Sequence, residues 1–125
     1  MPISNSGRIL LVDDSSTMRG IVRKMLTELG FTKVDEAADG AAALTKLDEY
    51  DYELVISDWN MEPMNGHALL ERVRSNQRLE NLPFIMMTAE TDEDKLIEAK
   101  FAGVNSFISK PFSAETLKAK ILQIE

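Results

Sequence analysis

The sequence predicts an α/β fold in which a parallel sheet is covered by helices on both faces. Two patterns predict it. Short apolar runs alternate five times with segments of helical periodicity along the 125 residues. The first, third and fourth of these runs are apolar at successive positions rather than at every second one, which is typical of strands buried on both faces. Hydrophobic residues make up 44% of the chain, enough to fill such a core.

The first strand is predicted over residues 8–12, and a helix follows it. The apolar residues of that segment recur at the spacing of one helix face: Met18, Ile21, Val22, Met25, Leu26 and Leu29. Asp14, Ser15 or Ser16 can cap the start of this helix, and Gly30 predicts its end.

The second and third strands are predicted over residues 32–37 and 54–58. The pattern over residues 32–37 is the weaker one. Residues 54–56, by contrast, are apolar at successive positions. Between them, Asp39 and Gly40 begin an alanine-rich helix that extends to about Leu47.

A loop over residues 59–66 precedes the third helix, whose apolar residues are Leu69, Leu70 and Val73. The fourth strand is predicted over residues 83–88, where an uninterrupted apolar run follows a proline.

The fourth helix is predicted from its acidic first turn, residues 92–94, which is favourable against the helix dipole. Its large apolar residues are Leu96, Ile97 and Phe101, and Gly103 ends it. The fifth strand is predicted over residues 104–109. Ser113 then caps a last helix, whose apolar residues are Leu117, Ile121 and Ile124.

Composition limits the function classes and the setting. A net charge of −7 argues against a nucleic-acid-binding protein, which needs a basic face. The chain has no cysteine and no apolar run long enough to span a membrane, and no secretory leader is recognisable. We therefore expect one cytoplasmic domain over residues 1–125, without membrane insertion, in which the polar residues 1–7 are flexible.

Four charged residues follow the predicted strands. Asp13 and Asp14 follow the first strand, Asp58 ends the third, and Lys110 follows the fifth. Because ligands bind beyond the carboxyl ends of strands in such sheets, the four side chains are expected in one pocket. Crowded carboxylates repel one another unless a cation lies between them, and Mg²⁺ prefers such oxygen ligands. Taken singly, the aspartates also suit turns and helix caps, and the lysine suits an exposed strand end.

These residues, together with Thr88 and the run Lys110-Pro111-Phe112, carry a resemblance to a known family. In five strand–helix units they resemble the receiver domain of two-component response regulators. The run of residues 56–61 and the Thr88-Ala89-Glu90 triplet are similar to the single-domain chemotaxis regulators of that family. The resemblance implies a flavodoxin-like, doubly wound (βα)5 fold with a five-stranded parallel sheet in the order 2-1-3-4-5.

The resemblance also implies a metal site and a phosphoacceptor. Asp58 matches the aspartate that takes a phosphoryl group from a histidine kinase. Asp14 matches a direct ligand of Mg²⁺, and Asp13 matches a ligand that acts through water. Asn60 matches the position whose backbone carbonyl completes the metal shell. Asp58 is itself a ligand in this scheme.

Further roles are implied around the phosphoryl group. Lys110 matches the lysine that bonds the acyl phosphate, and Thr88 the hydroxyl that moves onto a phosphate oxygen. Phe107 matches the aromatic residue whose rotamer reports the state of the switch. Asn60 and Glu90 match positions that tune how fast water removes the phosphoryl group.

Two positions depart from the family pattern. Phe107 stands where the chemotaxis regulator has tyrosine, so that a hydroxyl hydrogen bond is not available there. Pro63 is shifted by one position in the loop after Asp58, and we expect a local change of backbone that leaves metal binding intact. The family often has a cis peptide bond before the proline that matches Pro111, and we expect one here.

We weigh several functions on this basis. The first is a phosphorylation-controlled switch that binds the flagellar motor through the fourth helix, fifth strand and fifth helix. The alternative is a single-domain phosphate shuttle or sink in a phosphorelay. An aspartate-nucleophile phosphohydrolase is disfavoured, because it needs an acid where this chain has Asn60. A flavin-binding flavodoxin is disfavoured, because an acidic pocket without metal would repel the phosphate of the cofactor. We expect a monomer.

Overall fold

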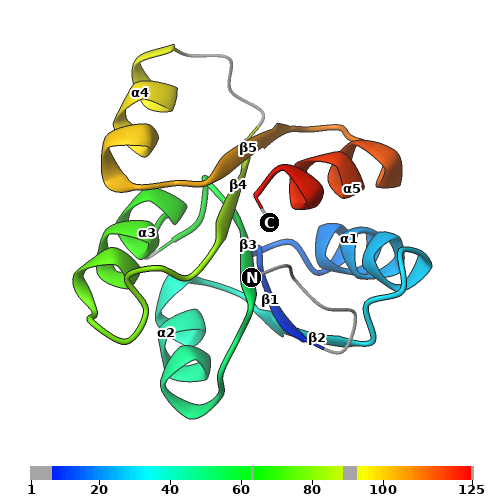
Figure 1. The fold of residues 1–125 in the computed structure, drawn as a ribbon, viewed down its shortest axis with the longest axis horizontal. Coiled ribbons are helices and arrows are strands. Elements are labelled where there is room, and N and C mark those ends of the chain that lie inside the picture. Colours follow the sequence, from blue (N-terminus) through cyan, green and yellow to red (C-terminus); the bar gives the residue numbers. More distant parts are fainter. Residues whose placement is uncertain (1–6, 63, 89–92, 125) are drawn as a thin grey trace.

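A computed structural model of the chain describes residues 7–62, 64–88 and 93–124. Within these residues, the strands form a single parallel sheet in the order β2-β1-β3-β4-β5, with helices on both of its faces (Figure 1). This confirms the predicted fold class and the strand order that the family resemblance implied.

The elements alternate along the chain as predicted. The strands are β1 Arg8–Val12, β2 Lys33–Ala37, β3 Leu54–Asp58, β4 Phe84–Thr88 and β5 Ser106–Ser109. The helices are α1 Ser16–Glu28, α2 Gly40–Glu49, α3 Gly66–Ser75, α4 Glu93–Ala102 and α5 Ala114–Gln123. The fifth strand begins two residues later than predicted, because the Val104 N–H still bonds the Ala99 carbonyl of the preceding helix.

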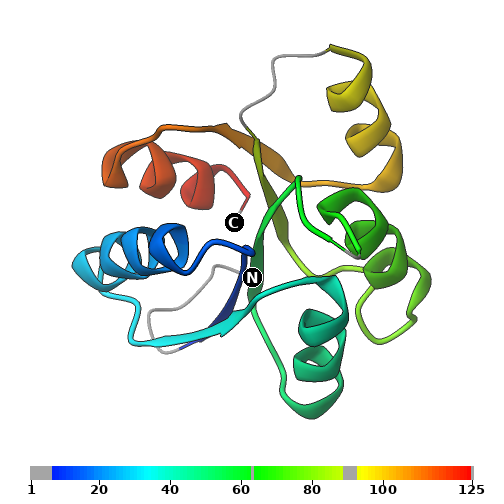
Figure 2. The same ribbon diagram turned by 180° about the vertical axis from the view of Figure 1, so that it is seen from behind.

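Two hydrophobic layers lie on the two faces of the sheet. Helices α1 and α5 cover one face, and α2, α3 and α4 cover the other (Figure 1, Figure 2). Alternate residues of a strand therefore belong to different layers: Ile9 and Leu11 pack with the α1 and α5 side, while Leu10 and Val12 pack on the opposite side. This double burial accounts for the uninterrupted apolar runs of the sequence.

The helix boundaries have local causes. Side chains of four N-cap residues accept a backbone N–H near the start of their helices: Ser15, Asp39, Asn65 and Ser113. Ser15 is thus the cap among the three candidates at the first helix. Gly30 and Gly103 follow their helices with φ of 98° and 95°, a conformation that favours glycine.

Three apolar residues that the helical spacing assigned to apolar faces are instead exposed. Ile21 is 47% exposed, Ile97 49% and Phe101 89%. In α1, the inward stripe centres on Val22 and Leu26, so Ile21 falls beside it. Among the α4 side chains that the structure describes, the small Ala99 is fully buried. The proposed acidic first turn includes Asp92, which lies outside the described residues, as do residues 1–6 of the segment expected to be flexible.

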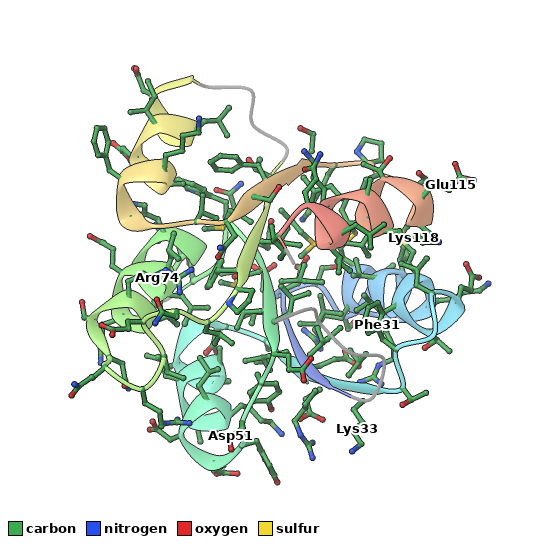
Figure 3. The ribbon with its side chains drawn as sticks, viewed as in Figure 1. Phe31, Lys33, Asp51, Arg74, Glu115 and Lys118 are labelled. Atoms are coloured by element: carbon green, nitrogen blue, oxygen red, sulfur yellow. The ribbon has the colours of Figure 1, made fainter. Side chains whose placement is uncertain are left out.

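Arg74 of α3 ties the helix to the amino ends of two strands (Figure 3). Its Nη1 donates to the Leu82 carbonyl at 2.6 Å, and its Nε donates to the Gly103 carbonyl at 2.9 Å. Its Nη2 donates to Asn105 Oδ1 at 2.9 Å, and the same oxygen accepts the Phe84 N–H. These bonds fix the edge of the sheet opposite to the aspartate cluster. None of the described helices has the length and apolar content needed to cross a membrane.

Candidate functional site

The carboxyl edge of the sheet gathers four charged side chains from three strands. Asp13 and Asp14 follow β1, Asp58 ends β3, and Lys110 follows β5. Because the strands are parallel, their carboxyl ends lie along one edge. Oxygens of the three carboxylates lie within 4.8 Å of one another. The structure therefore brings together the charged residues that the sequence placed in one pocket.

Asp13 is buried, with 1% of its surface exposed. Its Oδ1 accepts the Ser15 N–H at 2.9 Å, and its Oδ2 lies 3.4 Å from the Lys110 Nζ. Its own N–H donates to the Ala37 carbonyl of β2 at 3.1 Å. The carboxylate thus forms a turn just before the N-cap Ser15 and also faces the cluster, so the turn interpretation and the site interpretation hold together.

Asp58 forms the shortest ion pair of the cluster. Its Oδ1 lies 2.9 Å from the Lys110 Nζ, and the residue is only 6% exposed. Burial raises the pKa of the Asp58 carboxyl above its ordinary value of 3.8; the nearby Asp13 acts in the same direction, and Lys110 offsets only part of it. The site thus holds a carboxylate whose negative charge is incompletely compensated.

The Lys110 backbone is fixed as part of the sheet edge. Its N–H donates to the Thr88 carbonyl at 2.9 Å, and the Lys110–Pro111 peptide bond is cis, as expected. Thr88 is 2% exposed and lies opposite Ser109 in the register of β4 and β5. The hydroxyl-bearing residue and the lysine therefore belong to neighbouring strand ends.

Phe107 is half-buried on β5 and packs against the hydrophobic layer under α2, α3 and α4. It lies opposite Met86 in the register of β4 and β5. Its ring thus adjoins the core on the side away from α1 and α5.

The mouth of the site is polar. A cavity of about 350 Å³ is lined by Asp14, Asn60, Met61, Glu62 and Asn65. Asp14 and Asn60 are exposed there, which leaves oxygen atoms of both residues accessible to a ligand. Glu90 and Pro63 lie outside the described residues.

Gly66 permits a close approach that sequence reasoning did not single out. A Cβ at this position would lie 2.3 Å from the Asp58 carbonyl oxygen and 2.7 Å from the sulfur of Met86. The Gly66 N–H also donates to the Trp59 carbonyl at 2.9 Å. Only glycine lets α3 begin against the backbone of Asp58 without displacement. The available signal was a glycine directly after the N-cap Asn65.

Trp59 provides a fluorophore beside the cluster. Trp59 is 6% exposed, and its backbone N–H donates to the Met87 carbonyl at 3.0 Å. Its ring centre lies 5.6 Å from that of His67, whose Nδ1 is 3.4 Å from a carboxylate oxygen of Glu71. Changes in charge at the adjacent Asp58 can therefore alter the surroundings of the indole.

The donor set fits a hard divalent cation. Three carboxyl groups from two strand ends share one lysine, and all of them offer oxygens at close range. Oxygen ligands of this kind suit Mg²⁺, which commonly keeps several water molecules and also engages phosphate. The open, polar mouth beside Asp14 leaves room for both.

Comparisons with known proteins agree with this geometry. The family model described as response regulator receiver domain matches residues 9–122. The chemotaxis protein CheY of Pseudomonas aeruginosa is 49% identical over 117 residues, which cover 94% of both chains. CheY-3 of Vibrio cholerae is 47% identical over 122 residues, covering 98% of this chain and 94% of the relative. The solved structure of the Vibrio cholerae chemotaxis response regulator CheY4 superposes with a TM-score of 0.89 at 34% identity, covering 96% and 99% of the two chains.

Proposed function

The chain belongs to the family of response regulator receiver domains, and from that membership we propose that Asp58 accepts a phosphoryl group from a histidine kinase. Two relatives, at 49% and 47% identity, are chemotaxis proteins, and the chain is a CheY-like signalling domain rather than a classical enzyme. The observation that carries the proposal is the Lys110–Asp58 ion pair at 2.9 Å inside a cluster of three carboxylates. We treat residues 1–125 as one such domain.

The transfer requires positioning more than covalent help from the protein. A carboxylate oxygen of Asp58 attacks the phosphorus, the phosphorus–nitrogen bond to the kinase histidine breaks, and the imidazole leaves as the Asp58 acyl phosphate forms. Lys110, already bonded to Asp58, is placed to contact an oxygen of the arriving group. Burial of Asp58 limits the access of bulk water to the reacting atoms.

We assign the metal to the acidic side of the same pocket. Asp13, Asp14, Asp58 and the backbone carbonyl of Asn60 would hold Mg²⁺. When bound, the ion offsets the repulsion between the carboxylates and the phosphoryl group. Asp14 and Asn60 lie at the open mouth, where water molecules of the ion can also be accommodated.

The remaining site residues are proposed to read and reset the modification. Thr88 would move its hydroxyl onto a phosphate oxygen, and Phe107 would follow by a change in its burial beside the core. Because Phe107 has no hydroxyl, its part in the switch depends on packing alone. Asn60 and Glu90 are proposed to tune the rate at which water removes the phosphoryl group.

The output is proposed to be binding to the flagellar motor switch through the surface of α4, β5 and α5. The chemotaxis names of two relatives, at 49% and 47% identity, support this choice. The second candidate is a phosphate shuttle or sink, for which the same pocket suffices. A pull-down with motor-switch protein separates them, since only the first function predicts enrichment of the phosphorylated form. Both functions fit a monomer in the cytoplasm. Gel filtration measures the oligomeric state.

The Trp59 fluorescence tests the proposed chemistry directly. Mg²⁺ and then a small-molecule phosphodonor such as acetyl phosphate are added to wild type and to Asp58→Asn. We expect a donor response in wild type that needs Mg²⁺ and is absent from the variant. A donor response of equal size in Asp58→Asn would contradict the assignment of the phosphoacceptor.

A further inference from the structure

Arg19 of α1 contacts the main chain at the aspartate pair. Its Nη1 donates to the Asp13 carbonyl oxygen at 2.6 Å, and its Nε lies 2.9 Å from Glu36 Oε1. The Arg19 side chain is only 17% exposed. One guanidinium therefore joins α1, the end of β2 and the end of β1.

Glu36 gives this arginine a fixed anchor. Its second carboxylate oxygen is 2.7 Å from the Nε of Arg23, one helical turn after Arg19. Both oxygens of Glu36 are thus held by guanidinium groups of α1. Arg23 is more exposed, at 43%, and contacts Glu36 but not Asp13. The two arginines share an anchor, and only Arg19 extends from it to the aspartate pair.

The Asp13 carbonyl belongs to the peptide group that joins Asp13 to Asp14. The other polar groups of Asp13 are held by Ala37, Ser15 and Lys110. Rotation of the Asp13–Asp14 peptide group is therefore opposed on its carbonyl side by Arg19. Among the described residues, the exposed Asp14 carboxylate has no hydrogen-bonding partner that would fix it independently. Its placement depends on the backbone that Arg19 holds.

We propose that Arg19 is a positioning residue of the metal site, which orients the Asp13–Asp14 peptide and so places Asp14 for Mg²⁺. The inference rests on the proposed function, because it takes Asp14 as a ligand. Positioning and charge make opposite predictions for this residue. A guanidinium beside the site repels a cation, so an arginine that acted only by its charge would weaken Mg²⁺ binding, and its removal would strengthen it. An arginine that holds the ligands has the reverse effect.

The test is a Mg²⁺ titration of the full chain, followed by Trp59 emission and by calorimetry at constant ionic strength. For Arg19→Ala we expect the Kd for Mg²⁺ to rise about 10-fold, the lower end of what loss of a group that orients a metal ligand causes. Arg23→Ala is the matched control, because it removes the same charge and one guanidinium contact to Glu36, while the bond from Arg19 to Asp13 stays in place. Its Kd should stay at the wild-type value.

Arg19→Lys provides a second, milder variant. Its ammonium keeps the charge but lacks the planar fork that spans Glu36 and Asp13 together, so its Kd should lie between those of wild type and Arg19→Ala. Thermal melting shows which variants are folded, and if Arg19→Ala is not, Arg19→Lys carries the test. An unchanged or lower Kd in the folded Arg19 variant, or an equal rise in Arg23→Ala, would overturn the inference. If wild type itself binds no Mg²⁺, the proposed function fails, and the inference fails with it.

Discussion

At the scale of single residues, Asp58 is subject to opposing effects. Burial and the neighbouring Asp13 disfavour its negative charge, whereas Lys110 favours it, and the balance raises the pKa of Asp58. The folded chain therefore binds a proton at Asp58 more tightly than the unfolded chain does. As pH rises from about 3.8 through the raised folded pKa, ionisation of this group lowers the free energy of unfolding.

We predict that Asp58→Asn raises the metal-free melting temperature at pH 7, because the variant removes a charge that the folded state disfavours. Well below pH 3.8 the wild-type carboxyl is protonated in both states, so the difference should largely disappear. Thermal melts in EDTA at both pH values measure this. Asp51→Asn is the control, since the Asp51 side chain is fully exposed and should change the melting temperature little at either pH. A stabilisation by Asp58→Asn that is the same at both pH values would contradict the prediction.

At the scale of elements, two glycines illustrate different backbone requirements. Gly20 lies inside α1, and apart from its chain neighbours and the backbone of the helix itself, no atom lies within 4 Å of where its Cβ would be. Gly103 follows α4 with φ of 95°, and a Cβ there would lie 3.0 Å from the Nε of Arg74. The first position has no structural need for glycine among the described residues, whereas the second requires it.

Substitution by alanine should therefore change stability in opposite directions. Gly20→Ala should raise the free energy of unfolding by about 1 kcal/mol, the difference in helix propensity between the two residues. Gly103→Ala should lower it by roughly 1–2 kcal/mol, because alanine is strained in the left-handed region. Urea denaturation of both variants measures these changes. A destabilising Gly20→Ala would indicate that this face of α1 is packed more closely than the structure shows.

The elements were predictable because buried strands require apolar residues and helix N-caps favour a few polar residue types. The continuous apolar run that ends in Asp58 and the cap Asp39 are examples. The exposure of Phe101 was not predictable, because the small Ala99 takes the buried place in α4. In the site, charged residues at strand ends indicated the pocket. The contact of Arg19 involves a carbonyl oxygen, which every residue has, so residue type gave no signal for it. For Gly66 the only signal was a glycine directly after the N-cap Asn65.

At the scale of the whole molecule, metal binding should be linked to folding. The three carboxylates converge only in the folded chain, so Mg²⁺ binds the folded state in preference to the unfolded state. We predict that Mg²⁺ at about 100 times its Kd raises the free energy of unfolding by about 2.7 kcal/mol. Asp13→Asn should raise the metal-free melting temperature and reduce the effect of Mg²⁺, because it removes one carboxylate from the crowded cluster.

Denaturant titrations with and without Mg²⁺ measure this linkage, with sodium chloride at matched ionic strength as the control for screening. Equal stabilisation by both salts would show that the effect is not specific to the cluster. An unchanged melting curve for Asp13→Asn would count against repulsion among the carboxylates.

The pairing of Lys110 with Asp13 joins residues that are 97 positions apart in the chain. During synthesis on the ribosome, all three aspartates emerge long before the lysine does. A nascent chain that stops before β5 would contain the proposed phosphoacceptor but lack the cation that pairs with it. On the proposed function, a chain thus becomes competent for signalling only after β5 and Lys110 have been synthesised.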